Sequence, residues 1–140
     1  YVRIEIKDTT NPYGYVQLGR VFVGGGFVPT LGASYGLADG WDDLSRLDYT
    51  LSGALVADVG RRRRWVKFAL DFLSHANEAP IVHEMLRRLG SVGEVLYLPD
   101  ISNWQDCQRY GFVGRLRELS PIEYPYHRIR STGISIEELI

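Results

Sequence analysis

Residues 61–98 constrain the fold most, because two different periodicities meet within them. Every second residue is apolar at Val66, Phe68, Leu70 and Phe72, which is typical of a strand with one buried face. The spacing then becomes helical, and a short apolar run at residues 95–98 follows. This order predicts a strand, a helix and a second strand, the helix presenting one apolar stripe made of Ile81, Val82, Met85, Leu86 and Leu89.

Both ends of the predicted helix carry termination signals. Asn77 is a favourable N-cap residue, and Glu78 places a negative charge in the first turn. Arg87 and Arg88 suit the negative end of the helix dipole, and Gly90 can adopt the positive φ that ends a helix. These signals predict one amphipathic helix over residues 77–89, around which the strands are organised.

The rest of the chain is typical of short strands joined by glycine-rich turns. Residues 27–43 give a weak signal and are predicted to be a long ordered loop, and residues 99–108 a shorter loop. We therefore expect a single domain over residues 1–140, mainly β with one α-helix (α+β), an antiparallel β-sandwich or partly closed barrel with a flanking helix. The further strands are expected at residues 1–7, 15–23, 46–51, 54–59, 110–119, 124–130 and 134–140, the first two forming a hairpin.

Composition excludes several classes of protein. The 140 residues have a net charge of −1, which gives no global attraction to nucleic acid or to an anionic membrane surface. Cys107 is the one cysteine, so the chain has no internal disulfide, cysteine zinc site or iron–sulfur cluster of its own. No apolar run reaches the length of a membrane span.

Catalytic motifs are absent from the sequence. His75, His83 and His127 are too widely spaced to indicate a metal site, and His83-Glu84 lacks the second histidine of a metalloprotease helix. Acidic residues gather at Asp39, Asp42 and Asp43 and again at Glu137 and Glu138. With Glu84 they leave a glycosidase-like pair as the one enzymatic alternative. We expect neither catalytic residues nor a cofactor or metal, and we do not expect an enzyme.

Candidate binding residues are of two kinds. Arg61, Arg62, Arg63 and Arg64 are consecutive, and because strand residues alternate they cannot form one flat patch. They are predicted to make salt bridges between subunits, as an alternative to a solvated strand start. Trp41 is the other candidate for a subunit interface, and together with Trp104 it also suits a sugar-stacking platform.

The chain resembles tail proteins of long-tailed bacteriophages, and the order of its segments is similar to the tail-tube-like domain of distal tail (baseplate) proteins. The resemblance covers most of the chain and rests on pattern and order. It is carried by NPYGYVQLGRVFVG at residues 11–24, Ser34-Tyr35-Gly36, residues 66–73, residues 95–100, Gly114-Arg115-Leu116 and ISIEEL at residues 134–139.

The resemblance implies a non-enzymatic virion structural protein of the tail tip or baseplate. Such a domain would form a ring, a hexamer in that family, around the tail channel and would link the tail tube to tip proteins. Its implied partners are copies of itself and the tail tube, tape measure and hub proteins, with no membrane and no specific nucleic-acid binding. It would be made in the host cytoplasm and reside in the virion. The alternative is a jelly-roll carbohydrate-binding module on a virion or cell-surface protein.

Overall fold

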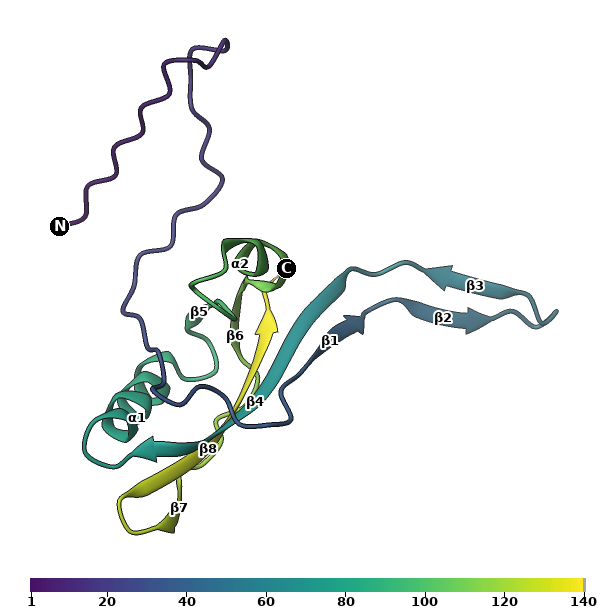
Figure 1. Ribbon diagram of the computed structural model, residues 1–140. Coiled ribbons are helices and arrows are strands. Elements are labelled where there is room, and N and C mark those ends of the chain that lie inside the picture. Colours follow the sequence, from purple (N-terminus) through teal and green to yellow (C-terminus); the bar gives the residue numbers. More distant parts are fainter. Residues whose placement is uncertain (140) are drawn as a thin grey trace.

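The computed structural model describes residues 1–139 (Figure 1). Residues 1–37 form no helix or strand. The elements that follow are β1 (Ala38–Asp43), β2 (Arg46–Tyr49), β3 (Leu55–Asp58), β4 (Arg62–Ser74), α1 (Glu78–Leu89), β5 (Glu94–Tyr97), α2 (Trp104–Tyr110), β6 (Phe112–Leu116), β7 (Glu123–Tyr126) and β8 (Ile129–Glu138).

Two antiparallel sheets contain the strands. The larger has six strands in the order β1-β4-β8-β6-β5, with β7 also paired to β8, and the smaller is the β2–β3 hairpin. Within residues 1–139 neither sheet closes into a barrel. The prediction of a mainly-β, antiparallel domain with a flanking helix is confirmed. None of the helices in this range is both long and apolar enough to cross a membrane.

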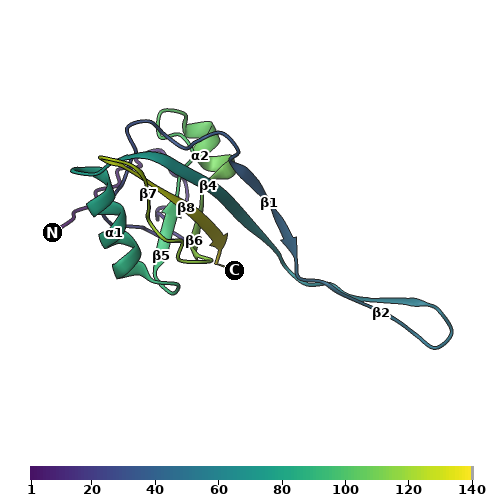
Figure 2. The same cartoon turned by 90° about the horizontal axis from the view of Figure 1, so that it is seen from below.

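The hydrophobic core lies between the six-stranded sheet and α1, which covers one of its faces (Figures 1 and 2). The central strands β4 and β8 contribute much of it, because both have a neighbour on each side. Phe27, far away in sequence, packs against the same cluster. The buried apolar members are Val66, Leu70, Leu73, Ala79, Val82, Phe112, Leu116, Ile134 and Ile136.

A β-bulge in β4 shifts the predicted alternation. Leu70 pairs with Thr132, but the next pair is Leu73 with Arg130, so β4 has one residue more than β8 between them. Leu73 is therefore buried at 2% exposure, while Phe72 is 59% exposed. The prediction that Phe72 shares the buried face of Val66 and Leu70 is wrong.

Helix α1 occupies the predicted residues, and Gly90 ends it with a φ of 54°. The start of the helix differs from the prediction, because the Asn77 side chain makes no capping hydrogen bond. The Glu78 carboxylate instead accepts hydrogen bonds from the backbone N–H groups of Ser74 and Thr30, both at 2.8 Å. Ile81, which the pattern places in the buried stripe, is instead 52% exposed, so that part of the prediction is wrong.

The predicted strands at residues 1–7 and 15–23 are wrong for the single chain. Both segments are extended, and the turn between them forms, with the Gly14 N–H donating to the Asn11 carbonyl at 3.4 Å. The two limbs then diverge instead of pairing (Figure 1). A strand needs a neighbour for its backbone groups, and neither limb has one within residues 1–139.

Three further boundaries were wrong. Residues 38–43, predicted as loop, form β1, and residues 104–110 form α2 in place of the predicted loop and strand start. The last two strands are β7 and a ten-residue β8 that runs straight through Gly133. Asn103 caps α2 by accepting hydrogen bonds from the N–H groups of Gln105 and Asp106.

The Glu78 contact gives a prediction on pH. Hydrogen bonds from Ser74 and then Thr30 lower the pKa of Glu78 below its ordinary value. Because the folded pKa is depressed, the stabilisation is present above the unfolded pKa of about 4.3 and is lost as pH falls through the folded value. We expect the protection factors of the Thr30 and Ser74 amides, which correct for the intrinsic pH dependence of hydrogen exchange, to fall at low pH in the wild type. Glu78→Gln should lower these protection factors already at neutral pH, and unchanged protection in that variant would contradict the role.

Candidate assembly surfaces

The chain exposes far more surface than a compact domain of its size. Its accessible surface is 11054 Å² for 15.9 kDa. A compact monomer of this mass exposes about 7,400 Å². The excess comes from two projections, residues 1–26, called here the N-terminal arm, and the β2–β3 hairpin, which extends away from the sheet in both views (Figures 1 and 2).

The β2–β3 hairpin has one apolar and one largely polar face. Leu47 lies opposite Ala57 and Tyr49 opposite Leu55, so these four side chains share one face. Arg46 and Asp58, and Asp48 and Val56, form the other face. All eight strand residues are exposed, so the apolar face, made of Leu47, Tyr49, Leu55 and Ala57, has nothing packed on it.

A tight crossing fixes the hairpin to β1 and β4. The Leu44 N–H donates to the Arg61 carbonyl at 3.2 Å, and the Gly60 N–H donates to the Ser45 hydroxyl at 3.0 Å. A Cβ atom at Gly60 would lie only 2.4 Å from the backbone carbonyl of Leu44. The backbones of residues 44–45 and 60–61 therefore cross so closely that only glycine fits at residue 60.

Gly60→Val is expected to displace the hairpin without unfolding the core. The new side chain must push the Leu44 backbone away, while the buried cluster between β4, β8 and α1 is untouched. We expect a melting temperature close to that of the wild type and chemical-shift changes confined to residues 44–61. Gly25→Val is the control, because its added Cβ would meet nothing within 4 Å. Shift changes throughout the core would contradict this local effect.

The arginine run is largely used within the chain. Arg63 contacts Asp42 at 3.2 Å and Glu137 at 3.1 Å. Arg115 lies 2.8 Å from the other carboxylate oxygen of Glu137. Arg62 pairs with Asp43 at 3.6 Å on the exposed edge. Arg63 and Arg115 thus neutralise the charge of the buried Glu137. Arg61 and Arg62 are the more exposed members of the run.

Arg64 points to the opposite face from Arg63, as strand alternation predicts. Its guanidinium donates to the Glu138 carboxylate, and this hydrogen bond lowers the pKa of Glu138. The guanidinium carbon lies 5.2 Å from the centre of the Phe112 ring and 5.8 Å from that of Trp41. Two of the predicted interface residues, Trp41 and Arg64, therefore meet in one place.

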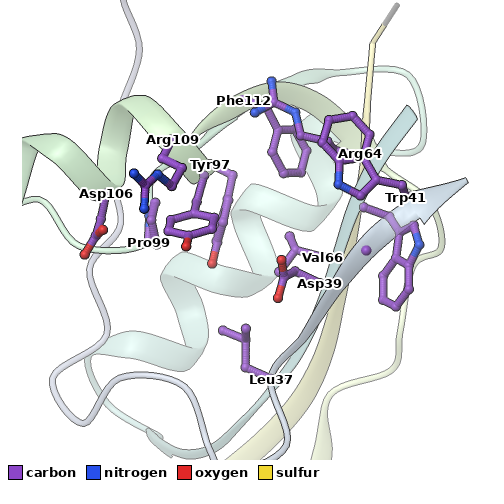
Figure 3. A pocket seen from close by; sticks show the side chains of 13 residues that line it. Leu37, Asp39, Trp41, Arg64, Val66, Tyr97, Pro99, Asp106, Arg109 and Phe112 are labelled. Atoms are coloured by element: carbon purple, nitrogen blue, oxygen red, sulfur yellow. The ribbon is translucent and has the colours of Figure 1, made fainter. Parts of the chain in front are cut away.

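Trp41 and Arg64 line a pocket of about 480 Å³ between β1 and α2 (Figure 3). Leu37, Asp39 and Trp41 form its β1 side, and Pro99, Asp106 and Arg109 form the side of α2. Tyr97, whose pKa is raised by burial and by the nearby charge of Asp39, lies between them. The pocket is thus aromatic at its centre and bears both signs of charge at its margin.

The acidic residues do not converge as a glycosidase pair at the predicted cluster. Asp42 and Asp43 bind arginines of β4, and Glu84 binds Arg87 and Arg88, whose hydrogen bonds lower its pKa to about 2. Asp39 alone of the predicted acids lines the pocket. Over residues 1–139, no three His, Cys, Asp or Glu side chains are placed to hold a metal ion.

Sequence reasoning missed the pocket because its walls come from elements that it did not predict. β1 and α2 were both assigned to loops, so nothing indicated that Trp41 would lie beside Tyr97 and Arg109. Trp104, the other predicted sugar-stacking residue, starts α2 and does not line the pocket. One signal in the sequence could have predicted the pairing of β1 with β4: the acidic Asp42 and Asp43 lie opposite the basic Arg63 and Arg62.

No protein-family model matches this chain, and no curated protein matches it significantly.

Proposed function

We propose that this chain is a non-enzymatic structural subunit that assembles with copies of itself. The observation that carries the proposal is the uncovered apolar face of the β2–β3 hairpin, Leu47, Tyr49, Leu55 and Ala57. A two-stranded hairpin in water is marginally stable on its own and needs further packing on its apolar face. Another subunit supplies that packing.

The assembly that fits best is the ring at the tail tip or baseplate of a long-tailed bacteriophage, where it links the tail tube to tip proteins. Support comes from the resemblance of the sequence to distal tail proteins. The projecting hairpin and arm also suit contacts that run around a ring, since obligate interfaces commonly bury 2,000 Å² or more in total. The arginine–carboxylate pairs connect β1, β4, β6 and β8 within the one sheet.

The test is to measure the mass and shape of the purified full-length chain. Light scattering should give a defined multimer, and negative-stain images should show annular particles. Antibodies against the chain should label the distal end of phage tails. A chain that stays monomeric at tens of micromolar, and that is absent from virions, would refute the proposal.

A second candidate function is carbohydrate binding, and the aromatic pocket is the observation that favours it. Trp41 and Tyr97 could stack on apolar sugar faces while Asp39 and Arg109 bind hydroxyl groups. Glycan-array binding that is lost in Trp41→Ala and kept in Trp104→Ala would support this function. Trp104 is a matched control, because it is exposed like Trp41 but does not line the pocket.

A further inference from the structure

The outer edge of β1 is an unpaired edge of the larger sheet. β1 ends the strand order, so its outer N–H and C=O groups face no other strand within the described chain. The aromatic pocket opens directly beside this edge, with Leu37 and Trp41 exposed in its wall. An open edge next to an apolar pocket can take an additional strand whose apolar side chains fill the pocket.

The N-terminal arm has the pattern that such a strand requires. Val2, Ile4 and Ile6 alternate with Arg3, Glu5 and Lys7, and all six are exposed and extended. One link between the arm and the domain is the ion pair of Arg20 with Glu94 of β5. Both partners are about half exposed, so solvent screens the pair and it holds the arm only weakly. This ion pair does not prevent the arm from leaving its position in the single chain.

Three consecutive glycines provide the hinge. Gly25 and Gly26 have no positive φ, and a Cβ atom added to either would meet nothing within 4 Å. Alanine would fit at both positions in this conformation, so the conformation seen here does not require glycine, and the three glycines leave the backbone free to adopt others. Beyond the hinge the chain is fixed, because Phe27 packs on the core and Thr30 binds Glu78.

We infer that the first residues of one copy form an added antiparallel strand on β1 of a second copy, an inference that rests on the proposed self-assembly. With Ile4 opposite Trp41, the register sets Arg3 opposite Asp42 and Lys7 opposite Ala38. Val2, Ile4 and Ile6 then lie opposite Asp43, Trp41 and Asp39 on the pocket face of β1. Arg3, Glu5 and Lys7 lie opposite Asp42, Gly40 and Ala38 on the other face.

Length favours a second copy and this edge. The 22 peptide steps from Ile4 to Gly26 span up to about 75 Å when extended, which exceeds the size of the domain. The other sheet edge, β5, has four residues against six in β1, so β1 offers the longer edge to the arm. In the proposed register Arg3 lies opposite Asp42, the one acid on that face of β1.

The experiment is disulfide trapping between two differently tagged batches of the full-length chain. Both carry Cys107→Ser; one carries Lys7→Cys and the other Ala38→Cys. A disulfide needs Cβ atoms about 4 Å apart, a distance that directly opposite strand residues approach. After mixing, assembly and oxidation, the covalent heterodimer should be the main product. In the matched control, Leu96→Cys on the outer strand β5 replaces Ala38→Cys, and no heterodimer should form.

Each alternative outcome overturns the inference in a distinguishable way. Multimers that form without the heterodimer refute the arm contact and leave the proposed assembly standing. A chain that carries both cysteines and closes only an internal disulfide, with no heterodimer in the mixture, shows that the arm docks on its own β1. A mixture that remains monomeric by light scattering refutes both the arm contact and the proposed function.

Discussion

Val82→Asp is expected to destabilise the folded domain severely. Val82 is 0% exposed and lies in α1 against the sheet, within the same cluster as Leu70 and Ile134. An aspartate there would place a charge without a partner in an apolar site, at a cost of about 3–5 kcal/mol. A domain of this size has a total stability of about 5–15 kcal/mol, so a large part of it would be lost. Loss of the cooperative thermal transition in circular dichroism, or a large fall in its midpoint, would show the effect.

Ile81→Asp is the matched control for Val82→Asp. It makes a similar change one residue earlier in the same helix, but Ile81 is 52% exposed. A new negative charge in the first turns of a helix is neutral or favourable, so the variant should melt within a few degrees of the wild type. If both variants unfold alike, or neither does, the assignment of the buried face of α1 is wrong.

Leu55→Lys is expected to prevent assembly while the domain stays folded. Leu55 belongs to the uncovered apolar face of the hairpin and touches no part of the core cluster. Burial of one leucine side chain in an interface contributes about 1.5–3 kcal/mol, and the lysine adds the cost of burying a charge. Each contact would therefore weaken by roughly tenfold to a hundredfold or more. Light scattering should show monomers with an unchanged melting curve.

Val56→Lys is the control on the opposite face of the same strand. The two side chains are equally accessible, 56% exposed at Leu55 and 53% at Val56, and the charge change is identical. Lysine at Val56 lies opposite Asp48, which should stabilise the hairpin slightly. We expect this variant to assemble like the wild type. If Val56→Lys also gives monomers, the hairpin contacts its neighbour through the other face or through both.

The elements with strong local signals were predictable from the sequence. Helix α1 and its end at Gly90 follow from spacing and charge, and the β2–β3 hairpin follows from two short strands around Ser52-Gly53. Residues 62–74 form the long strand, and alternation correctly separates Arg63 from Arg64. Each of these features is set by residues close together in the sequence, so the pattern of apolar and charged residues predicts it.

The features that depend on distant partners were not predictable. β1 contains Asp39, Gly40 and Asp42, which disfavour strands in general, and it forms because β4 offers it a complete edge. The bulge that exposes Phe72 is set by the pairing of β4 with β8. α2 is only seven residues long and carries no apolar stripe, although Asn103 followed by Asp106 is a capping signal.

The candidate site shows the same division. Trp41 and the four arginines were identified by residue type, but the partners of Arg63 and Arg64, Glu137 and Glu138, come from the far end of the chain. The pocket beside Trp41 needs β1, β5 and α2 to be placed together. β1 is placed by its pairing with β4, and β5 by its pairing with β6, so the pocket depends on tertiary contacts that local sequence patterns do not reveal.

The isolation of the β2–β3 ribbon has a consequence for the order of events in a cell. Because it shares no buried cluster with the sheet, it opens and closes without the rest of the domain, and its amides should exchange quickly with solvent. In the proposed assembly, a newly made chain would keep a protease-sensitive stretch near Leu51 exposed until a neighbour engages it. Degradation would then remove surplus chains selectively, and incorporation would protect the rest.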